Sequence, residues 1–281
     1  IVRVPEYSQD SSPGGYYNPP ALDGSRPGRF YINQKDTADN PKWKLPTLMI
    51  HEGAPGHHFQ LSAQQLIKGV PMLRKVLPFS AYAEGWALYA ERVAKVDMGF
   101  YESDPLGDLG RLQAEMFRAV RLVVDTGMHA KHWSREQAIE YMVAKTGMTE
   151  AEVTREIERY VVWPGQATSY KVGQLAMLRM REQAEKELGP KFDLRGFHEL
   201  ILMNGSMPLA VLEDVVVGSG VNAISAPATP LTPAIAATAP ASLSGAVTVT
   251  GVTDVYATTR ALQYLGVKAI DDKTFEVTLK A

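Results

Sequence analysis

Three histidines and one glutamate lie within eight positions of the chain, at His51, Glu52, His57 and His58. Imidazole nitrogen and carboxylate oxygen are the ligands that Zn²⁺ takes when no thiolate is available, and this chain has no cysteine. In the common H-E-x-x-H zinc helix, the glutamate beside the first histidine acts as general base on the water that the metal activates. The stretch therefore predicts a zinc site, with Glu52 as the general base.

The spacing of these histidines departs from that motif. The residue four positions after His51 is Pro55, which cannot ligate a metal, and on an unbroken helix His58 would lie about 10.5 Å along the axis from His51. Pro55 interrupts helical hydrogen bonding, and the glycines beside it tolerate unusual dihedral angles. A bulge that loops out two residues would restore the H-E-x-x-H arrangement, as is frequent at functional sites. We therefore predict His51 and His57 as ligands, with His58 as the substitute for His57; the alternative is a Gly/Pro turn with solvated histidines.

A second stretch, residues 80–91, has the pattern of a helix rich in alanine and aromatic residues. Glu84 lies there among small and apolar neighbours, where a carboxylate is costly unless it is paired or bound to a metal. Beside the histidine cluster, this position predicts Glu84 as the third metal ligand. The alternative is a salt bridge from Glu84 to Arg92 or Arg111.

Several separated motifs, in this order, resemble the bacterial domain-of-unknown-function 885 family over residues 7–216. They are LDGSRPG at 22–28, HEGAPGHHFQ at 51–60, EGWA at 84–87, DTGMH at 125–129 and WPGQA at 163–167, followed by Tyr170 and Gly173. That family is grouped with zinc metallopeptidases of the thermolysin-like, or gluzincin, superfamily, in which a later helix supplies a glutamate as third ligand. The resemblance implies a mainly helical, peptidase-like fold, a zinc cofactor and a hydrolytic site, but it gives no defined substrate.

Two further residues are one helical turn apart at the end of a helix predicted over residues 105–131, namely Asp125 and His129. An aspartate that orients a histidine is a recurrent arrangement in metal and proton-transfer sites. The alternative is a histidine that caps the last carbonyl groups of its helix. Together with the family resemblance, the pair makes His129 a candidate for contact with the substrate or the transition state.

The turn at Trp163, Pro164 and Gly165 predicts the start of another helix, which runs to about residue 188. Helical metallopeptidases take hydrogen-bond donors for the oxyanion from such a helix. We select Tyr170 first as the catalytic donor, and we assign Tyr160, Gln166 and Arg26 to substrate binding. For each tyrosine the alternative is a buried side chain with a hydrogen-bonded hydroxyl.

The elements that must position these residues are mostly helices. Capping residues Ser134 and Thr149 open two of them. The predicted helices cover a broken segment over 46–68 and then 79–97, 105–131, 135–145, 150–161, 166–188, 193–203 and 207–216. Apolar residues at spacings of three and four predict the buried face of the helix over 105–131: Leu106, Leu109, Leu112, Met116, Phe117, Val120 and Val124.

A short apolar run over residues 29–33 predicts an edge strand. Phe30–Asn33 could align the substrate backbone by strand addition. An ordinary covering loop is the alternative.

Composition narrows the class of protein. The 281 residues are 45% hydrophobic and 21% charged, which is typical of a globular protein. The net charge of −2 and the lack of a long basic run argue against a nucleic-acid partner, and no apolar run is long enough to span a membrane. The chain begins at Ile1 and resembles the C-terminal portion of its family, so we expect a bacterial fragment or processed piece, compatible with an exported, periplasmic location, whose targeting signal would lie outside it.

The composition also divides the chain. Residues 1–217 are predicted to form the C-terminal portion of a metallopeptidase-like domain. Residues 218–246 have the Ala/Pro/Thr-rich composition of a linker, and residues 247–281 alternate as a small β-like tail. The tail is similar to a short piece of peptide-type extracellular solute-binding proteins; we assign it no function and expect weak packing.

These observations predict a zinc-dependent hydrolase, a peptidase acting on peptide or small amide substrates. One alternative is an inactive or truncated relative whose metal helix is structural or empty. Another is a peptide-binding module, which the tail suggests.

Overall fold

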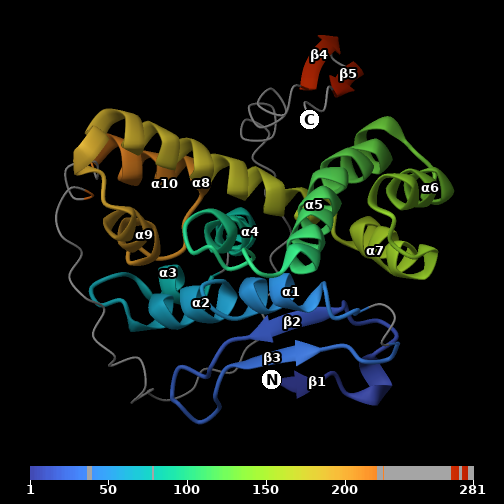
Figure 1. Ribbon diagram of the computed structural model, residues 1–281, viewed down its shortest axis with the longest axis horizontal. Coiled ribbons are helices and arrows are strands. Elements are labelled where there is room, and N and C mark those ends of the chain that lie inside the picture. Colours follow the sequence, from blue (N-terminus) through green and yellow to red (C-terminus); the bar gives the residue numbers. More distant parts are fainter. Residues whose placement is uncertain (37–39, 78, 220–223, 225–266, 272–273, 278–281) are drawn as a thin grey trace.

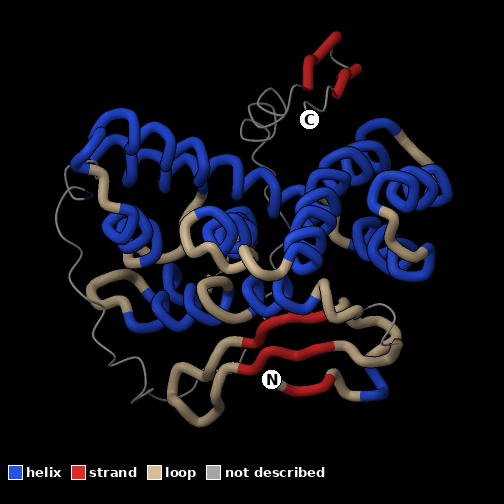
Figure 2. Tube along the Cα trace, viewed as in Figure 1, coloured by secondary structure: helices blue, strands red, loops and turns tan. Residues whose placement is uncertain are grey.

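The computed structural model describes residues 1–36, 40–77, 79–219, 224, 267–271 and 274–277. This part is mainly helical, with a small sheet against one side, so the predicted fold class is confirmed (Figure 1, Figure 2). The helices are α1 (Leu45–Glu52), α2 (His57–Leu66), α3 (Met72–Val76), α4 (Ser80–Val96), α5 (Pro105–Lys131), α6 (Arg135–Thr146), α7 (Glu150–Val162), α8 (Gln166–Leu188), α9 (Leu194–Leu202) and α10 (Leu209–Glu213). Short 3₁₀ segments η1 (Glu6–Ser8) and η2 (Gly189–Lys191) and a π-helical turn η3 (Asp214–Ser219) complete the helical elements.

Several helix boundaries follow from capping residues. The side chain of Asp104 accepts a hydrogen bond from the Gly107 backbone N–H at the start of α5. Ser134 forms a full capping box with Gln137 at the start of α6, and Thr149 caps α7. These side chains satisfy N–H groups that the first turn of a helix leaves without partners.

The sheet differs from the prediction. Its strands are β1 (Val2–Arg3), β2 (Gly15–Asn18) and β3 (Arg29–Ile32), in the order β1-β3-β2. The run predicted as an edge strand is therefore the central strand, parallel to β1 and antiparallel to β2. Its two neighbours are short and flanked by glycine, proline and serine, which obscured them in the sequence. With both edges paired, β3 cannot align a substrate by strand addition, and β2 lies at the edge instead.

The core is built around the crossing of α4 and α8, which Figure 1 shows in the middle of the helical layer. Gly85 and Gly173 meet there, since a Cβ on Gly85 would lie 2.5 Å from the Gly173 Cα, and one on Gly173 would clash with the carbonyl oxygen of Ala81. This contact lets the two backbones approach closely. A large apolar cluster packs around α4, α8, α9 and α10, and a second joins α5, α6 and α7. The crossing fixes the start of α8 beside Glu84.

The predicted buried face of α5 is only half correct. Val120 and Val124 are buried, but the four apolar residues of the first half are exposed: Leu106, Leu109, Leu112 and Met116. Instead α5 turns Gly110 inward, so close to the carbonyl oxygen of Trp43 that no side chain would fit. A close backbone contact, which hydropathy does not encode, sets the rotation of this half of the helix.

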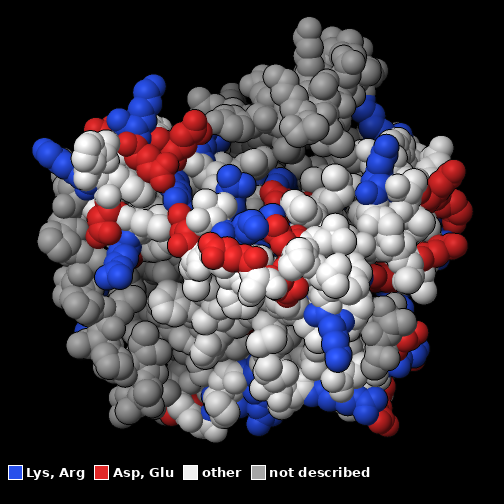
Figure 3. Space-filling model, in the orientation of Figure 1, with Lys and Arg blue, Asp and Glu red and all other residues white. Residues whose placement is uncertain are grey.

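The C-terminal strands β4 (Val267–Asp271) and β5 (Thr274–Val277) form an antiparallel pair, as the alternating pattern predicts. Most of the predicted linker, residues 218–246, lies outside the described residues. None of the helices in the described part of the chain combines the length and the apolar character that a membrane span requires. Acidic and basic side chains are interspersed on the face shown in Figure 3.

Candidate metal centre

The metal-capable histidines lie on either side of an interruption between two helices. Helix α1 ends at Glu52 and α2 begins at His57, so residues 53–56 form a connection rather than the two-residue bulge that we predicted. The Gly56 N–H donates to the carbonyl oxygen of Ile50 at 3.0 Å, and a Cβ on Gly56 would collide with carbonyl oxygens of α1. The Trp86 Nε1–H donates to the carbonyl oxygen of Pro55 at 2.8 Å and ties the connection to α4.

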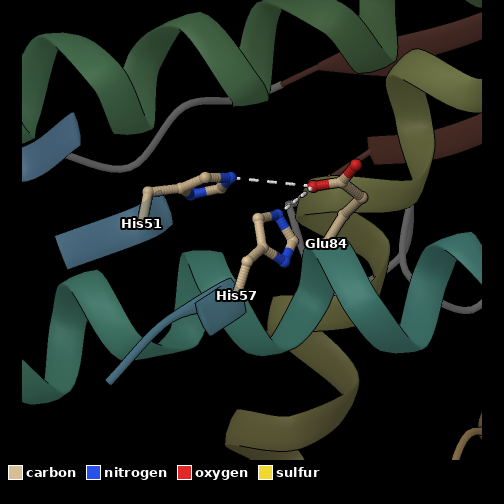
Figure 4. A group of neighbouring side chains, drawn as sticks. All are labelled: His51, His57 and Glu84. Carbon is tan, nitrogen blue, oxygen red and sulfur yellow. Dashed lines mark hydrogen bonds and ion pairs between the residues drawn. The ribbon is translucent and has the colours of Figure 1, made fainter. Parts of the chain in front are cut away.

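This connection brings three predicted ligands together. Figure 4 shows His51 from α1, His57 from α2 and Glu84 from α4 pointing toward one another. Glu84 Oε2 lies 3.1 Å from His57 Nε2 and 3.6 Å from His51 Nε2, and one donor atom from each residue lies within 4.8 Å of the others. The alternative salt bridge of Glu84 does not form to Arg111, which pairs with Asp108 and Glu115 instead.

The two neighbouring histidines differ in their surroundings. His57 is buried and faces Glu84, whereas His58 is exposed and its Nδ1 lies 2.7 Å from the Tyr17 hydroxyl. Since α2 begins at His57, the next residue is rotated by about 100° on the helix. The geometry therefore favours His57 over His58 as the ligand.

A carboxylate to which the sequence gave no role stands behind His51. Glu91 is 2% exposed, and its Oε1 lies 2.7 Å from His51 Nδ1. In the neutral ring, Nδ1 donates to Glu91 and Nε2 is left as the acceptor that faces Glu84. Metal-ligating histidines typically donate their second ring N–H to a carboxylate in this way. Glu91 follows Glu84 by seven residues, two turns along the same face of α4, and this spacing is the signal that could have revealed it.

The electrostatics of the cluster favour a cation. Burial by itself would lower the pKa of His51, but the carboxylates of Glu84, Glu91 and Glu52 raise it to about 9. Burial would likewise raise the pKa of Glu84, but His57 and His51 hold that pKa well below its ordinary value. A divalent cation would satisfy this negative environment as a proton does.

The donor set also fits zinc. Bonds of about 2.0–2.2 Å to a tetrahedral ion place neighbouring ligand atoms about 3.4 Å apart. The two histidine-to-Glu84 separations, 3.1 and 3.6 Å, bracket that value. Two imidazoles and one carboxylate form the ligand set of catalytic zinc sites that keep a fourth position open.

A cavity of about 860 Å³ opens beside the cluster and is lined by His51, His57 and Glu84. Three predicted residues also line it: Glu52, which is buried, Tyr170 and Gln166. The Tyr170 ring stacks on His51 with centroids 6.1 Å apart. Gln166 Nε2 donates to the Tyr170 hydroxyl at 3.3 Å and lies 3.5 Å from Glu84 Oε1. Glu52 also lines a second cavity of about 370 Å³.

Three other predicted site residues are not among those that line the cavity. Tyr160 is buried, and its hydroxyl accepts from Arg121 Nε and donates to Glu156. His129 Nδ1 lies 3.3 Å from Asp125 Oδ1 and 2.9 Å from the Asp125 carbonyl oxygen, so the predicted contact between the two side chains forms, but neither residue lines the cavity. Arg26 donates to the neighbouring Pro27 carbonyl oxygen in the loop between β2 and β3.

The same helices carry residues that the sequence reasoning missed. Arg118, Arg121 and Arg159 also line the cavity, and no sequence motif contains them. His198, on α9, also lies partly buried near the core. It packs on Trp86 and is hydrogen-bonded to the Tyr89 hydroxyl at 2.9 Å, and burial, with help from Arg181, lowers its pKa to about 4.

Comparison with protein families decides the relationship. The family described as bacterial protein of unknown function (DUF885) matches residues 1–216. The chain belongs to this family. The matched residues include every residue of the candidate metal centre. The family resemblance that we drew from the motifs is therefore confirmed. No curated protein matches the chain.

Solved structures extend the comparison. A candidate lipoprotein from Colwellia psychrerythraea is 54% identical with a TM-score of 0.77, and the match covers 79% of this DUF885 chain and 38% of that one. A candidate lipoprotein of unknown function from Shewanella oneidensis is 24% identical with a TM-score of 0.65, covering 77% of this chain and 40% of that one; this likeness shows the fold alone. The chain therefore spans about two fifths of the length of these structures.

Proposed function

We propose that this chain is a zinc-dependent hydrolase that cleaves peptide bonds. The observation that carries the proposal is the His51–His57–Glu84 cluster, whose donor atoms lie within 4.8 Å of one another beside a large cavity. Grouping of the family with gluzincin-type metallopeptidases agrees with this ligand set. A Zn²⁺ ion held there would polarise the substrate carbonyl group and lower the pKa of a water molecule to about 7.

Glu52 is the general base of this proposal. It directly follows His51, and it is a buried residue that lines the same cavity as the cluster. There it takes a proton from the attacking water and passes it to the leaving amine.

Tyr170 supplies the hydrogen bond to the oxyanion. Burial and the charge of Glu84 raise the pKa of its phenol, so the proton stays on the hydroxyl at neutral pH. A neutral donor fixed beside the reacting carbonyl stabilises the charge that develops in the transition state. Gln166 holds the hydroxyl in place by donating to its oxygen.

The sheet offers a means of aligning the substrate. Residues 14–17, which include most of β2, line the cavity, and β2 is an edge strand of its three-stranded sheet. An extended peptide could pair with this edge by strand addition. The role that we first gave to Phe30–Asn33 therefore passes to β2.

The relatives suggest where the protein works. The relative from Colwellia psychrerythraea, 54% identical, is described as a candidate lipoprotein, which supports an exported location for this chain. Since the chain covers only 38% and 40% of those structures, activity of the whole protein is part of the proposal.

The test is zinc content and peptide hydrolysis in matched variants. Wild type should hold about one zinc per chain by mass spectrometry of the metal. His51→Ala and Glu84→Ala should lose it, whereas Glu52→Gln should keep the zinc and lose hydrolysis of a fluorogenic peptide. His58→Ala is the control, because His58 is exposed and faces Tyr17; it should retain the metal.

The outcomes separate the alternatives. No zinc above background, even after zinc is supplied, would refute the ligand assignment and favour an inactive relative. Zinc that is retained without hydrolysis of any peptide in wild type would indicate a structural metal. Peptide binding that Glu52→Gln leaves unchanged, without turnover, would indicate a binding module.

A further inference from the structure

An arginine cluster, formed by Arg118, Arg121 and Arg159, lines the same cavity as the metal centre. The first two come from α5 and the third from α7. Long cationic side chains are rarely buried without partners of opposite charge. Here the Arg121 side chain is 5% exposed and that of Arg118 is 13% exposed. Within the described part of the chain, the three arginines have only two carboxylate neighbours, Glu156 and Glu91.

Each of the three guanidinium groups keeps a buried nitrogen without a hydrogen-bond partner. These atoms are Arg118 Nε, Arg121 Nη1 and Arg159 Nε. Among the described residues, four buried side-chain nitrogens lack a hydrogen-bond partner, and this cluster contains three of them. Buried donors are normally satisfied, so a concentration beside one cavity indicates a place for an acceptor that comes from outside the chain.

The charges of the cluster point to an anion. Glu156 Oε2 accepts from Arg121 Nη2 and from Arg159 Nη2, each at 2.8 Å, so two cations share one carboxylate. Arg118 Nη2 lies 3.7 Å from Glu91, whose same oxygen contacts His51 at 2.7 Å. One positive charge is left over beside Glu156, and a carboxylate group would balance it.

The Arg121 guanidinium is held in a fixed orientation. Its Cζ lies over the rings of Phe117 and Tyr170, at 4.1 and 4.4 Å from their centroids. Its Nε donates to Tyr160 at 2.7 Å and its Nη2 to Glu156, so Nη1 is the remaining nitrogen. A planar fork that is already oriented loses little entropy when it binds a carboxylate. This gives Tyr160 a positioning role.

The distance from the metal centre sets the length of the bound group. The Tyr170 ring lies 4.4 Å from Arg121 Cζ and 6.1 Å from the His51 ring, so these two distances together limit the separation of the guanidinium and the imidazole. The contacts of a bound peptide with the guanidinium at one end and with the metal centre at the other take up part of that separation. Each extended residue of the peptide spans about 3.5 Å. One residue fits between the two sites, or two at most.

We infer that the arginine cluster binds the terminal carboxylate of a peptide, so that the enzyme acts as a carboxypeptidase on the last one or two residues. This inference rests on the proposed function, since it names the substrate of the same site. Hydrolysis consumes one water: the C–N bond breaks, a C–O bond forms, and the released amino acid or dipeptide leaves with the proton on its new amine. The other product is a shortened peptide with a new carboxylate.

The first experiment compares one peptide as its free acid and as its C-terminal amide. With the zinc-loaded wild type, kcat/KM for the acid should exceed that for the amide at least tenfold, and the product should be a free amino acid or a dipeptide. Equal cleavage of the two forms, or cleavage far from the C-terminus, would overturn the inference while leaving the proposed function intact.

The variant is Arg159→Gln, which leaves Glu156 with Arg121 and removes the surplus charge. It should raise KM for the acid at least tenfold with a small change in kcat, and Arg159→Lys should recover part of the loss. Arg179→Gln is the matched control: Arg179 is 27% exposed against 23% for Arg159, it pairs with one carboxylate at 2.9 Å, and it does not line the cavity. If Arg159→Gln still prefers the acid over the amide, the arginine cluster does not recognise the terminal carboxylate.

A binding experiment keeps the inference testable if no peptide is hydrolysed. Calorimetry with protein stripped of metal by a chelator would compare 3-phenylpropanoate with 3-phenylpropanamide. Binding of the acid at least ten times tighter than the amide, lost in Arg159→Gln, would support the arginine cluster as the anion site even if the hydrolase proposal failed. Equal affinities in the metal-free protein would refute it, because a carboxylate bound only by metal gives no preference there.

Discussion

Replacing Glu91 by glutamine tests whether the carboxylate behind His51 belongs to the metal centre. Glu91 Oε1 lies 2.7 Å from His51 Nδ1, and both side chains are at most 3% exposed. Glutamine has nearly the same shape, and its amide oxygen can still accept from Nδ1. The change therefore removes the negative charge that makes the imidazole a better ligand, with little change in packing.

The expected loss can be bounded. Removing a partner of a metal-bound histidine typically costs 10–100-fold in metal affinity, or about 1.4–2.7 kcal/mol. Burial keeps solvent from screening the pair, so the loss should lie in the upper half of that range. Arg118 Nη2 lies 3.7 Å from the same oxygen, so the variant also leaves this positive charge without its carboxylate neighbour, which further weakens the affinity for a cation.

The assay is competition for zinc with a chromogenic chelator. Glu115→Gln is the matched control, because Glu115 is a half-buried carboxylate that bonds to Lys171 at 2.7 Å and to Arg111 at 3.2 Å, and it does not line the cavity. That variant should lose stability and keep its zinc affinity. A zinc affinity of Glu91→Gln within threefold of wild type would refute the proposed support of His51.

Three further predictions concern the scaffold. Gly173→Ala should destabilise the protein by about 3 kcal/mol, measured by urea unfolding, because its Cβ would clash with backbone at the α4–α8 crossing. Trp86→Phe should cost about 1 kcal/mol in the same assay and weaken zinc affinity, because it removes the 2.8 Å bond to the loop between His51 and His57. Glu156 is buried, which would raise its pKa, but the two arginines beside it hold that pKa at about 2, below the ordinary 4.5. Its contribution, roughly 3 kcal/mol at most, is thus present above pH 4.5 and lost as the pH falls toward 2, so the stability gap between wild type and Glu156→Gln should close over that range.

Each of these predictions has a control. Gly218→Ala should leave stability unchanged, since a Cβ there would meet nothing within 4 Å, and equal stability of Gly173→Ala would contradict the close crossing. Trp133→Phe should not change zinc affinity, because Trp133 packs in the second apolar cluster. Glu158→Gln removes an exposed carboxylate and is the control for Glu156→Gln; it should show no comparable stability gap that closes between pH 4.5 and 2. A stability gap for Glu156→Gln that stays constant down to pH 2.5 would disprove the depressed pKa.

The sequence alone was sufficient for most helices and for part of the site. Capping residues and periodicity predicted α5, α6 and α7 within one residue at each end, because caps and apolar spacing act locally. The types and order of His51, Glu52, His57 and Glu84 were sufficient to nominate a metal centre, since few other side chains can ligate zinc without cysteine.

The tertiary structure decided what depends on contacts between distant segments. It separated His57 from His58, because the packing of Gly56 on the end of α1 sets where α2 begins. It placed β3 at the centre of the sheet and His129 among the residues that do not line the cavity. It also gathered the arginine cluster from α5 and α7, which no motif links in the sequence. These features depend on how closely two backbone segments pack and on how each helix is rotated about its axis. Neither can be predicted from the spacing of residue types along one segment.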